Sequence, residues 1–421
     1  MNHTLDSANK QAYAKPEARF EQRAAELAES SALRECQRWF YRNKLWVNEQ
    51  HLQLCRIPSP TFLEHERAEW MAEQFDSLGW EAKPDRAGNI IAYANGRREG
   101  PFVAVTAHLD TVLAPRNPHE IRVAPDGRFY GPGVSDNGAG LAALLALAAV
   151  WKTAQPVKER CGPSLVLVAN VGEEGEGNLN GMRYLCKSSP LGGRIRSYVV
   201  LDGPSTDHIT CRALASRRFE LVVSGPGGHS WSDHGNGNAV HALSRVIHYF
   251  TESLQSEPQA STKSSFNFGV IEGGLSVNSI PASARTKLDI RAEDPQKLDE
   301  LARCFGLAVE RAIEVENARS TGGKVQARIR EIGFRPGGSL SETSELLPSL
   351  RAVDSYLGIR AHLDCASTDA NIPLSMGLEA VSIGAGGQGG GAHTEAEWFD
   401  PDGRELGLQR ILLAVCMLLT A

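Results

Sequence analysis

The sequence predicts an α/β protein in which a mostly parallel sheet is flanked by helices and a smaller α+β domain is inserted. Three observations lead to this fold class. The chain has 421 residues, more than one hydrophobic core usually serves. In its first half, short apolar runs alternate with helical patterns, which is typical of parallel sheets covered on both faces. From Arg217 the order becomes strand-helix-strand-strand-helix-strand, the order of a ferredoxin-like unit.

The elements of the larger domain follow from apolar runs and from the residues that interrupt them. Continuous or alternating apolar segments predict strands, and apolar residues at helical spacing predict helices. The segment 89–94 ends in Asn95-Gly96, a turn pair. The predicted strands are 89–94, 102–107, 164–171, 198–201 and 380–383, and the predicted helices are 45–55, 63–78, 140–151, 346–357 and 406–419.

The inserted domain and the domain boundaries follow from the same patterns. Its predicted strands are 219–223, 266–271, 284–291 and 324–332, and its predicted helices are 239–254 and 295–315. Residues 1–44 are rich in Ala, Glu, Gln and Arg and predict an N-terminal helical extension. We therefore expect a larger domain over 45–213 and 336–421, and an inserted domain over 214–335.

Composition and charge limit the classes of partner. The chain is 42% hydrophobic and 22% charged, as is usual for soluble proteins. A net charge of −6 gives no reason to expect nucleic acid or an anionic membrane as a partner. The longest apolar run, 141–150, is too short to cross a bilayer, and the first residues do not resemble a signal peptide. Eight scattered cysteines without a C-x-x-C pair predict free thiols and a cytoplasmic protein.

Polar side chains follow the predicted parallel strands of the larger domain where each strand ends. In a parallel sheet these ends lie along one edge, where α/β folds bind ligands. The strand at 102–107 is followed by a histidine and an aspartate two residues apart, which face the same side because side chains alternate. A further aspartate precedes the helix at 140–151. Two histidines and five carboxylates are thus expected to meet: His108, Asp110, Asp136, Glu173, Glu174, Asp202 and His393.

This many acids suggests a site for divalent metal ions. Unpaired carboxylates away from water are costly, and cations remove that cost. Histidine and carboxylate ligands without cysteine suit Zn²⁺ first, and then Co²⁺ or Mn²⁺. Two ions about 3.5–4 Å apart would need a bridging carboxylate and a bridging water, whose pKa would fall toward neutrality.

Simpler interpretations exist for each motif taken alone. His108 and Asp110 could be a hydrogen-bonded pair at a strand end, and Glu173-Glu174 could be a solvated acidic turn. The agreement between several strand ends favours the metal site. The glycines of 384–389 fit a dinucleotide pattern, but no helix opens after them, so a nicotinamide cofactor is not expected. The chain has no Gly-x-Ser-x-Gly motif for a serine hydrolase.

These motifs together resemble a known family, the peptidase T-like di-zinc metallohydrolases. That family includes glutamate carboxypeptidase, aminoacylase, acetylornithine deacetylase and succinyl-diaminopimelate desuccinylase. The resemblance covers residue 45 to the C-terminus, including the inserted domain. Its motifs are Ala107-His108-Leu109-Asp110, the segment 131–138 around Asp136, Glu173-Glu174-Gly175, Asp202-Gly203 and Ala392-His393-Thr394.

The resemblance implies a role for each of the seven residues. Asp136 would bridge two zinc ions, and His108, Glu174 and Asp202 would complete the two sites. His393 would lie at the site of Glu174. Asp110 would orient His108, and Glu173 would be the general base. The sequence alone does not say which of the two adjacent glutamates is the ligand.

The resemblance also implies roles for three residues of the inserted domain. In similar enzymes this domain mediates dimerisation, and a histidine reaches the partner's active site, which here would be His229. Asn278 and Arg291 would hold the carbonyl or carboxylate of the substrate. Simpler alternatives are a structural turn for His229, a turn cap for Asn278 and a surface ion pair for Arg291. The loop 367–371 could line the substrate pocket or cap a helix.

The sequence thus predicts an enzyme that hydrolyses an amide bond in a small peptide, with two Zn²⁺ per chain. An N-acyl amino acid deacylase of the same family is the alternative. A non-catalytic binding relative is a remote one, because all seven site residues are present. The expected partners are a small peptide or N-acyl amino acid and a second copy of the chain, bound through the inserted domain.

Overall fold

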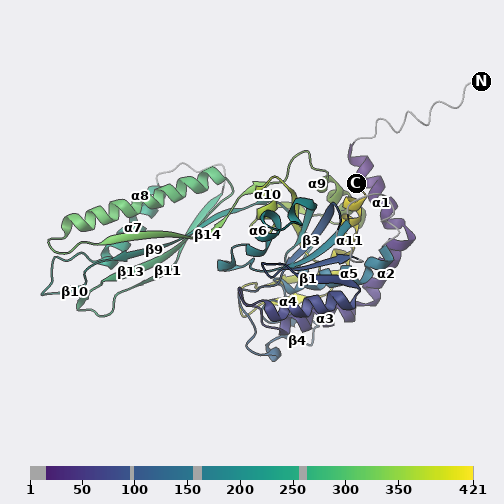
Figure 1. Cartoon of the computed structure of the whole chain (residues 1–421), viewed down its shortest axis with the longest axis horizontal. Helices are drawn as coiled ribbons and strands as arrows, with labels where there is room; N and C mark the ends of the chain where they lie inside the picture. The colour runs from purple at the N-terminus through teal and green to yellow at the C-terminus, as the bar shows by residue number, and fades with distance from the viewer. Residues whose placement is uncertain (1–15, 95–98, 155–163, 256–262, 421) are drawn as a thin grey trace, which may run out of the picture. The chain divides into compact units, whose positions relative to one another are not determined.

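The structure, a computed structural model, describes residues 16–94, 99–154, 164–255 and 263–420 (Figure 1). The first 15 residues of the predicted extension, the turn pair Asn95-Gly96 and Cys161 lie outside them. The chain divides into two compact units. Unit 1 comprises Met1–Arg212 and Ser339–Ala421, and unit 2 comprises Ala213–Gly338. The expected inserted domain, 214–335, lies within unit 2.

A nine-stranded mixed sheet forms the centre of unit 1. Its strand order is β1-β2-β6-β3-β7-β17-β8-β15, and β16 also pairs with β8. The four central strands β6, β3, β7 and β17 are parallel, whereas β1, β2 and β8 pair antiparallel at the two edges. The predicted α/β class is confirmed. The strands are β1 (Trp80–Pro84), β2 (Ile90–Ala94), β3 (Phe102–His108), β6 (Ser164–Asn170), β7 (Ile195–Leu201), β8 (His208–Ala213), β15 (Gly338–Ser339), β16 (His362–Ala366) and β17 (Glu379–Ile383).

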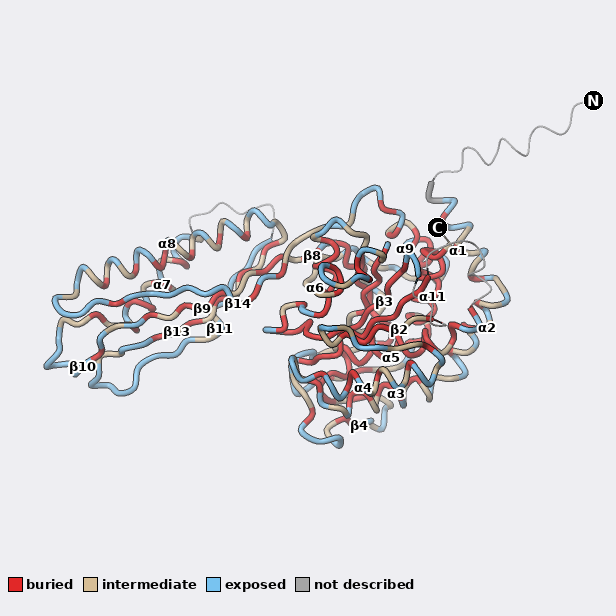
Figure 2. Tube along the Cα trace, viewed as in Figure 1, coloured by how far each residue is buried: buried red, intermediate tan, exposed pale blue. Residues whose placement is uncertain are grey.

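Helices cover this sheet and bury its central strands, which appear red in Figure 2. All seven residues of β3 and of β6 are buried. Helix α5 is apolar around its circumference because other helices cover its outer side. The helices of unit 1 are α1 (Pro16–Glu29), α2 (Ser31–Arg42), α3 (Lys44–Arg56), α4 (His65–Ser77), α5 (Gly138–Ala154), α6 (Asn180–Lys187), α9 (Leu346–Leu357), α10 (Asn371–Ser375) and α11 (Arg404–Leu419).

The N-terminal helices are part of the core of unit 1. Helix α1 packs on α9 and α11, and α2 packs on α5. Their buried residues include Phe20, Leu33 and Phe40, which join the same hydrophobic cluster as the central strands. The described part of the predicted extension therefore forms an outer helical layer of unit 1, as Figure 1 shows.

A second, small sheet in unit 1 carries two loops that matter for the site. It contains β4 (Arg122–Val123), β5 (Phe129–Tyr130), β18 (Gln388–Gly390) and β19 (Trp398–Asp400), in the order β18-β19-β5-β4. The loop after β5 contains Asp136, and the loop between β18 and β19 contains His393. These strands of two or three residues were not predicted.

Unit 2 has the predicted order of strands and helices. Its antiparallel sheet β11-β13-β9-β14 has α7 and α8 packed on one face, around a core that includes Phe219, Phe250 and Phe305. The edge strands β11 and β14 are largely exposed in Figure 2. The elements are β9 (Ala215–Ser224), β10 (Gly228–His229), α7 (Ala239–Gln255), β11 (Ser264–Gly273), β12 (Ser279–Ile280), β13 (Ser283–Ala292), α8 (Pro295–Arg319) and β14 (Gln326–Arg335).

Within the described residues, no helix combines the length and the apolar character needed to span a bilayer. The seven cysteines among these residues carry free thiols, as predicted.

Candidate metal centre

The ends of three parallel strands and a loop of the small sheet bring the predicted metal ligands together. His108 ends β3, the adjacent glutamates follow β6, Asp202 follows β7 and the loop after β18 supplies His393. Three groups of side chains offer ligand atoms that lie within 4.8 Å of one another. They are His108 with Asp136 and Asp202, Asp136 with Glu174 and His393, and His108 with Glu173 and Glu174.

Asp136 lies between the two histidines and faces each with a different oxygen. Its Oδ1 lies 3.0 Å from Nε2 of His108, and its Oδ2 lies 3.0 Å from Nε2 of His393. The Nε2 atom of His393 is also 2.8 Å from Oε1 of Glu174. On the other side, Nε2 of His108 is 3.9 Å from Oδ1 of Asp202. One carboxylate thus belongs to two adjacent groups of nitrogen and oxygen ligands, a donor set that suits zinc and similar ions.

The charged and buried groups of the cluster raise the pKa values of three of its members. Hydrogen bonds to Asp136 and Glu174 raise the pKa of His393 to about 10. For His108, burial lowers the pKa, but the carboxylates of Asp110 and Asp136 outweigh burial and the net shift is upward. Burial and the negative charge of Asp136 raise the pKa of Asp202 to about 7. The carboxylates hold protons on the histidines, and a bound cation would displace those protons.

Asp110 fixes the turn that carries the two glutamates. Its carboxylate accepts the backbone N–H groups of Glu173 and Glu174, each at 2.9 Å, and the hydroxyl of Thr61 at 2.9 Å. The Nδ1 atom of His108 donates to the backbone carbonyl oxygen of Asp110 at 2.9 Å, whereas the carboxylate is 3.6 Å away. Asp110 therefore orients the imidazole mainly through its main chain, and its side chain positions the glutamates.

Two residues that the sequence analysis did not single out support this centre. Asn137 accepts the N–H of Gly203 at 3.2 Å and donates to the carbonyl of Leu201 at 2.8 Å, which links the loops of Asp136 and Asp202. Glu397 accepts three backbone N–H groups from the loop that contains Asp136. No periodicity or spacing in the sequence distinguishes these residues from ordinary loop residues.

The three predicted substrate-binding residues lie in unit 2, and only two of them are neighbours. His229 in β10 pairs with Ser279 in β12, and the carbonyl of Asn278 accepts the N–H of Ser230 at 2.9 Å. Arg291 lies at the opposite end of β13, eight residues beyond Ser283, which is roughly 27 Å along a strand. Its Nε donates to Asp289 at 2.7 Å, so the surface ion pair foreseen as its alternative is present.

The imidazole of His229 is exposed, and its hydrogen bonds indicate which ring nitrogen carries the proton. Its Nδ1 accepts backbone N–H groups from Trp231 at 3.2 Å and from Ser232 at 3.4 Å. A nitrogen that accepts carries no proton in the neutral ring, so the proton lies on Nε2. That nitrogen is a hydrogen-bond donor.

The loop 367–371 leads into helix α10 and is held by side-chain hydrogen bonds. The side chain of Asn371, the first residue of α10, accepts the N–H of Thr368 at 3.0 Å. The buried Asp369 accepts from the side chain of Asn170 at the end of β6, at 2.6 Å. These contacts hold the loop at the start of α10, although its N-cap residue, Ala370, makes no side-chain capping hydrogen bond.

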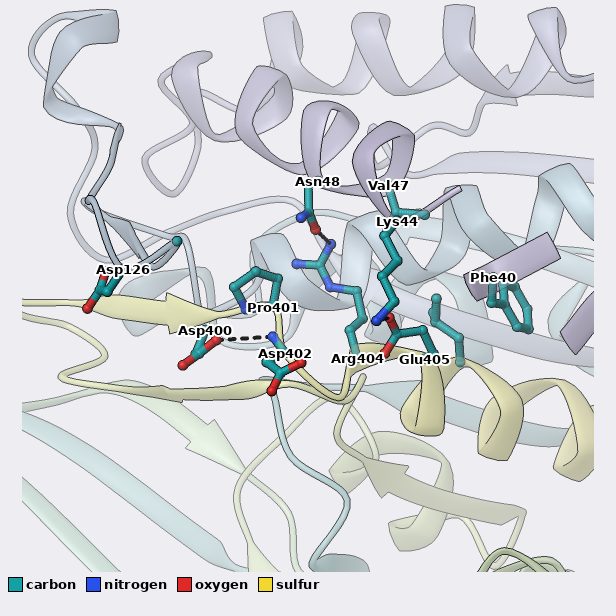
Figure 3. Close-up of a pocket in the computed structure, with 12 residues that line it drawn as sticks. Phe40, Lys44, Val47, Asn48, Asp126, Asp400, Pro401, Asp402, Arg404 and Glu405 are labelled. Atoms are coloured by element: carbon teal, nitrogen blue, oxygen red, sulfur yellow. Dashed lines mark hydrogen bonds and ion pairs between the residues drawn. The ribbon is translucent and has the colours of Figure 1, made fainter. Parts of the chain in front are cut away.

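A pocket of about 200 Å³ lies between α2, α3 and the start of α11 (Figure 3). Arg404 lines it and donates to Asn48, as Figure 3 shows. The same guanidinium donates to Nδ1 of the buried His51, whose Nε2 donates to the carbonyl of Val134 at 2.7 Å. This chain of hydrogen bonds connects the pocket with the loop that contains Asp136.

Comparison with known proteins identifies the family. The profile of peptidase family M20/M25/M40 matches residues 104–415. The chain belongs to this family. The predicted resemblance is confirmed, and the family and its named relatives support a hydrolytic enzyme.

Relatives of this M20-family enzyme carry peptidase and deacylase names. A probable carboxypeptidase of Aspergillus oryzae is 28% identical over 222 residues, which cover 48% of this chain and 50% of that protein. Succinyl-diaminopimelate desuccinylase of Corynebacterium glutamicum is 25% identical over 339 residues, which cover 79% of this chain and 86% of that protein. The chain therefore spans only about half the length of the fungal relative.

Solved structures share the fold of this M20-family enzyme. Aminopeptidase PepT from Bacillus cereus superposes with a TM-score of 0.66 at 19% identity, over 89% of this chain and 99% of that one. A tripeptidase from Staphylococcus aureus gives 0.69 at 21% identity, over 90% and 99%. At these identities the likeness shows the fold alone.

Proposed function

We propose that the enzyme hydrolyses an amide bond in a small peptide with the help of two zinc ions. The single observation that carries the proposal is the position of Asp136. One carboxylate contacts two histidines through different oxygens, and each histidine belongs to a separate group of ligands. A bridging carboxylate between two ions requires this arrangement.

The ligands divide between two sites around that bridge. His108 and Asp202 would hold one ion, and Glu174 and His393 would hold the other. The three carboxylates and a hydroxide would balance the charge of two dications. The donor set would also suit Co²⁺ or Mn²⁺ in place of Zn²⁺, because it contains no sulfur. When bound, the metal pair supplies a nucleophilic water at neutral pH and polarises the carbonyl of the substrate.

Glu173 would act as general base and then as general acid. It is buried beside Glu174 and His108, and Asp110 fixes its backbone through the N–H group. Its carboxylate would take a proton from the attacking water and pass that proton to the leaving nitrogen. The adjacent Glu174 faces His393, so the two glutamates have the different surroundings that different roles require.

The end of unit 2 that contains His229 and Asn278 would bind a second copy of the chain. Trp231, Leu275 and Val277, close to these residues in the sequence, have exposed apolar side chains. Exposed apolar groups beside polar ones are typical of protein interfaces. The Nε2–H of His229 would donate to the oxyanion in the partner's site, and Asn278 and Arg291 would contact the substrate.

A deacylase is the second candidate function, and one observation favours it. The alignment with the desuccinylase covers 79% of this chain, more than the alignment with the fungal carboxypeptidase. Both reactions cleave an amide, so the same centre would serve either. The substrate is therefore either a small peptide or an N-acyl amino acid.

Metal content and amine release test the proposal together. The protein is purified without chelator, and metal per chain is measured beside the hydrolysis of dipeptides, tripeptides, N-acetyl and N-succinyl amino acids. We expect two ions per chain and cleavage of peptides. Two ions with cleavage of acyl amino acids alone would favour the deacylase. A protein that takes up no Zn²⁺, Co²⁺ or Mn²⁺ would contradict the proposed centre.

A further inference from the structure

Glu397 lies in the loop after His393 and is almost completely buried, with 3% of its surface exposed. Both oxygens of its carboxylate accept hydrogen bonds from one short segment of backbone. Oε2 accepts the N–H of Gly133 at 2.8 Å, and Oε1 accepts the N–H groups of Ser135 at 2.7 Å and Asp136 at 2.8 Å. In addition, the carbonyl of Glu397 accepts the N–H of Gly131 at 3.1 Å.

The segment 131–136 depends on this carboxylate for its conformation. It is neither helix nor strand, so its N–H groups have no regular partners, and buried N–H groups without partners are costly. Gly133 has φ of +76°, and a Cβ there would lie 2.6 Å from the side chain of Thr111. The backbone therefore turns sharply, directs its N–H groups inward and meets a single anion.

The same carboxylate couples two residues of the candidate metal centre. One of its hydrogen bonds ends on the backbone of Asp136 itself, and His393 lies four residues before Glu397 in the same loop. The short strands β5 and β19 pair beside this contact, with Trp398 opposite Tyr130. Glu397 thus holds the loop of Asp136 against the loop of His393, and these two residues lie 3.0 Å apart.

We propose that Glu397 is a positioning residue, which holds the backbone of Asp136 so that its two carboxylate oxygens face different histidines. This inference rests on the proposed function, since it assigns Glu397 to the same metal centre. Glu397 acts through three N–H groups. It is neither a ligand nor the general base.

The chemistry of the contact predicts which substitution breaks it. A glutamine in place of Glu397 has the same shape, but one oxygen becomes an NH₂ group that would face an N–H donor. The negative charge that strengthens these hydrogen bonds is also lost. Loss of a partner that orients a ligand typically weakens metal affinity or activity by about 10- to 100-fold. We expect Glu397→Gln to show a loss of that size.

The matched control is Glu395→Gln, two residues away, where the side chain is 87% exposed. Both variants and the wild type are prepared as holoenzymes. Dissociation constants for Zn²⁺ are measured by competition with a chelator, the visible spectrum of the Co²⁺ form reports the ligand geometry, and kcat and KM are measured on the best substrate. We expect weaker binding, an altered Co²⁺ spectrum and a lower kcat for Glu397→Gln, and wild-type values for Glu395→Gln.

A purely structural role predicts a different result. In that case Glu397→Gln would lower the thermal stability of the metal-free protein but keep the Zn²⁺ affinity and the Co²⁺ spectrum of the wild type, which would overturn the proposal. If Glu397→Gln does not fold, the same measurements on Glu397→Asp distinguish the positioning role from the purely structural one. That variant keeps the charge but shortens the side chain, and an affinity within twofold of wild type would equally overturn the proposal. Failure of the wild type to bind metal would instead contradict the proposed function.

Discussion

Asp136 shows at the scale of single residues how much of the candidate site could be predicted from the sequence. Each ligand follows an apolar strand or a glycine-rich turn, and strand ends share an edge, so the meeting of the seven residues could be predicted. The hydrogen bonds that the carboxylates of Asp110 and Glu397 accept from the backbone could not be predicted from the sequence. They depend on three-dimensional loop conformations that leave no periodic pattern in the sequence.

Glu173→Gln tests the proposed general base. The substitution keeps the size of the side chain and removes its ability to take a proton. Because general acid–base catalysis contributes about 10²- to 10⁴-fold, we expect kcat to fall by that factor while two metal ions stay bound. Steady-state kinetics and metal analysis on the same sample measure both quantities.

The exposed Glu176, three residues along the chain, provides the control as Glu176→Gln. We expect it to keep wild-type kinetics. Turnover by Glu173→Gln at the wild-type rate would exclude Glu173 as the base.

At the scale of elements, the segments with a strong apolar pattern could be predicted, whereas the strands of two or three residues were missed, and so were β1, β8, β16 and α6. The long strands and helices agree with their predicted positions to within a few residues. The sheet of β4, β5, β18 and β19 was missed because strands of two or three residues carry no periodicity. The packing of α1 and α2 was missed because an amphipathic helix does not reveal which surface it covers.

Phe40→Ala tests the N-terminal helical layer. Phe40 is fully buried in the cluster shared by α2 and the sheet of unit 1. Removing a buried phenylalanine side chain typically costs about 3–5 kcal/mol, so we expect a clear fall in the unfolding temperature. Its exposed neighbour provides the control, since Tyr41→Ala should change stability little. Equal stability of the two variants would show that α2 does not contribute to the core.

His51 predicts a specific pH dependence of stability. Burial and the positive charge of Arg404 hold its pKa well below 6.5, while Arg67 acts in the same direction. In the unfolded chain the imidazole takes up a proton below about pH 6.5, and in the folded state it stays neutral. Because the unfolded state binds more protons, stability is lost as the pH falls below 6.5, by about 1 kcal/mol between pH 7.5 and 5.5.

His51→Gln should remove this contribution, since glutamine can still donate to Val134 and accept from Arg404 but does not titrate in this range. Urea unfolding at pH 7.5 and 5.5 measures the difference between variant and wild type. The exposed His65, as His65→Gln, is the control. The same pH dependence in wild type and His51→Gln would mean that the imidazole is charged in the folded enzyme.

At the scale of the whole molecule, the fold class and the order of strands and helices along unit 2 could be predicted, because each rests on several strongly patterned elements. The sequence does not indicate assembly directly. His229 and Asn278 lie together at one end of unit 2, but Arg291 lies at the other. The three residues of a single chain therefore cannot all contact the same small group of a substrate. This separation is consistent with a site that draws residues from two copies.

Mixing two inactive variants tests whether His229 acts across a dimer. His229→Ala removes the proposed oxyanion donor and should lower kcat by about 10²- to 10³-fold. Mixed with Glu173→Gln after dissociation and reassembly, it should form heterodimers with one intact site, which restores about a quarter of the wild-type activity. The activity of each variant reassembled alone is the control. Absence of recovery in confirmed heterodimers would mean that His229 does not act on the partner subunit.

The position of His393 and Glu397 after unit 2 in the chain has a consequence for the order of synthesis. Every strand and helix of unit 2 lies between Ala215 and Arg335, so unit 2 can complete its sheet while the ribosome is still translating the rest. The candidate ligand group of Asp136 and Glu174 includes His393, and α11 fills the core only after residue 404 has emerged. Since domains fold as units during translation, the inserted domain is complete before the domain that surrounds it. The nascent chain therefore gains His393 and Glu397 only after the whole of unit 2 has been translated.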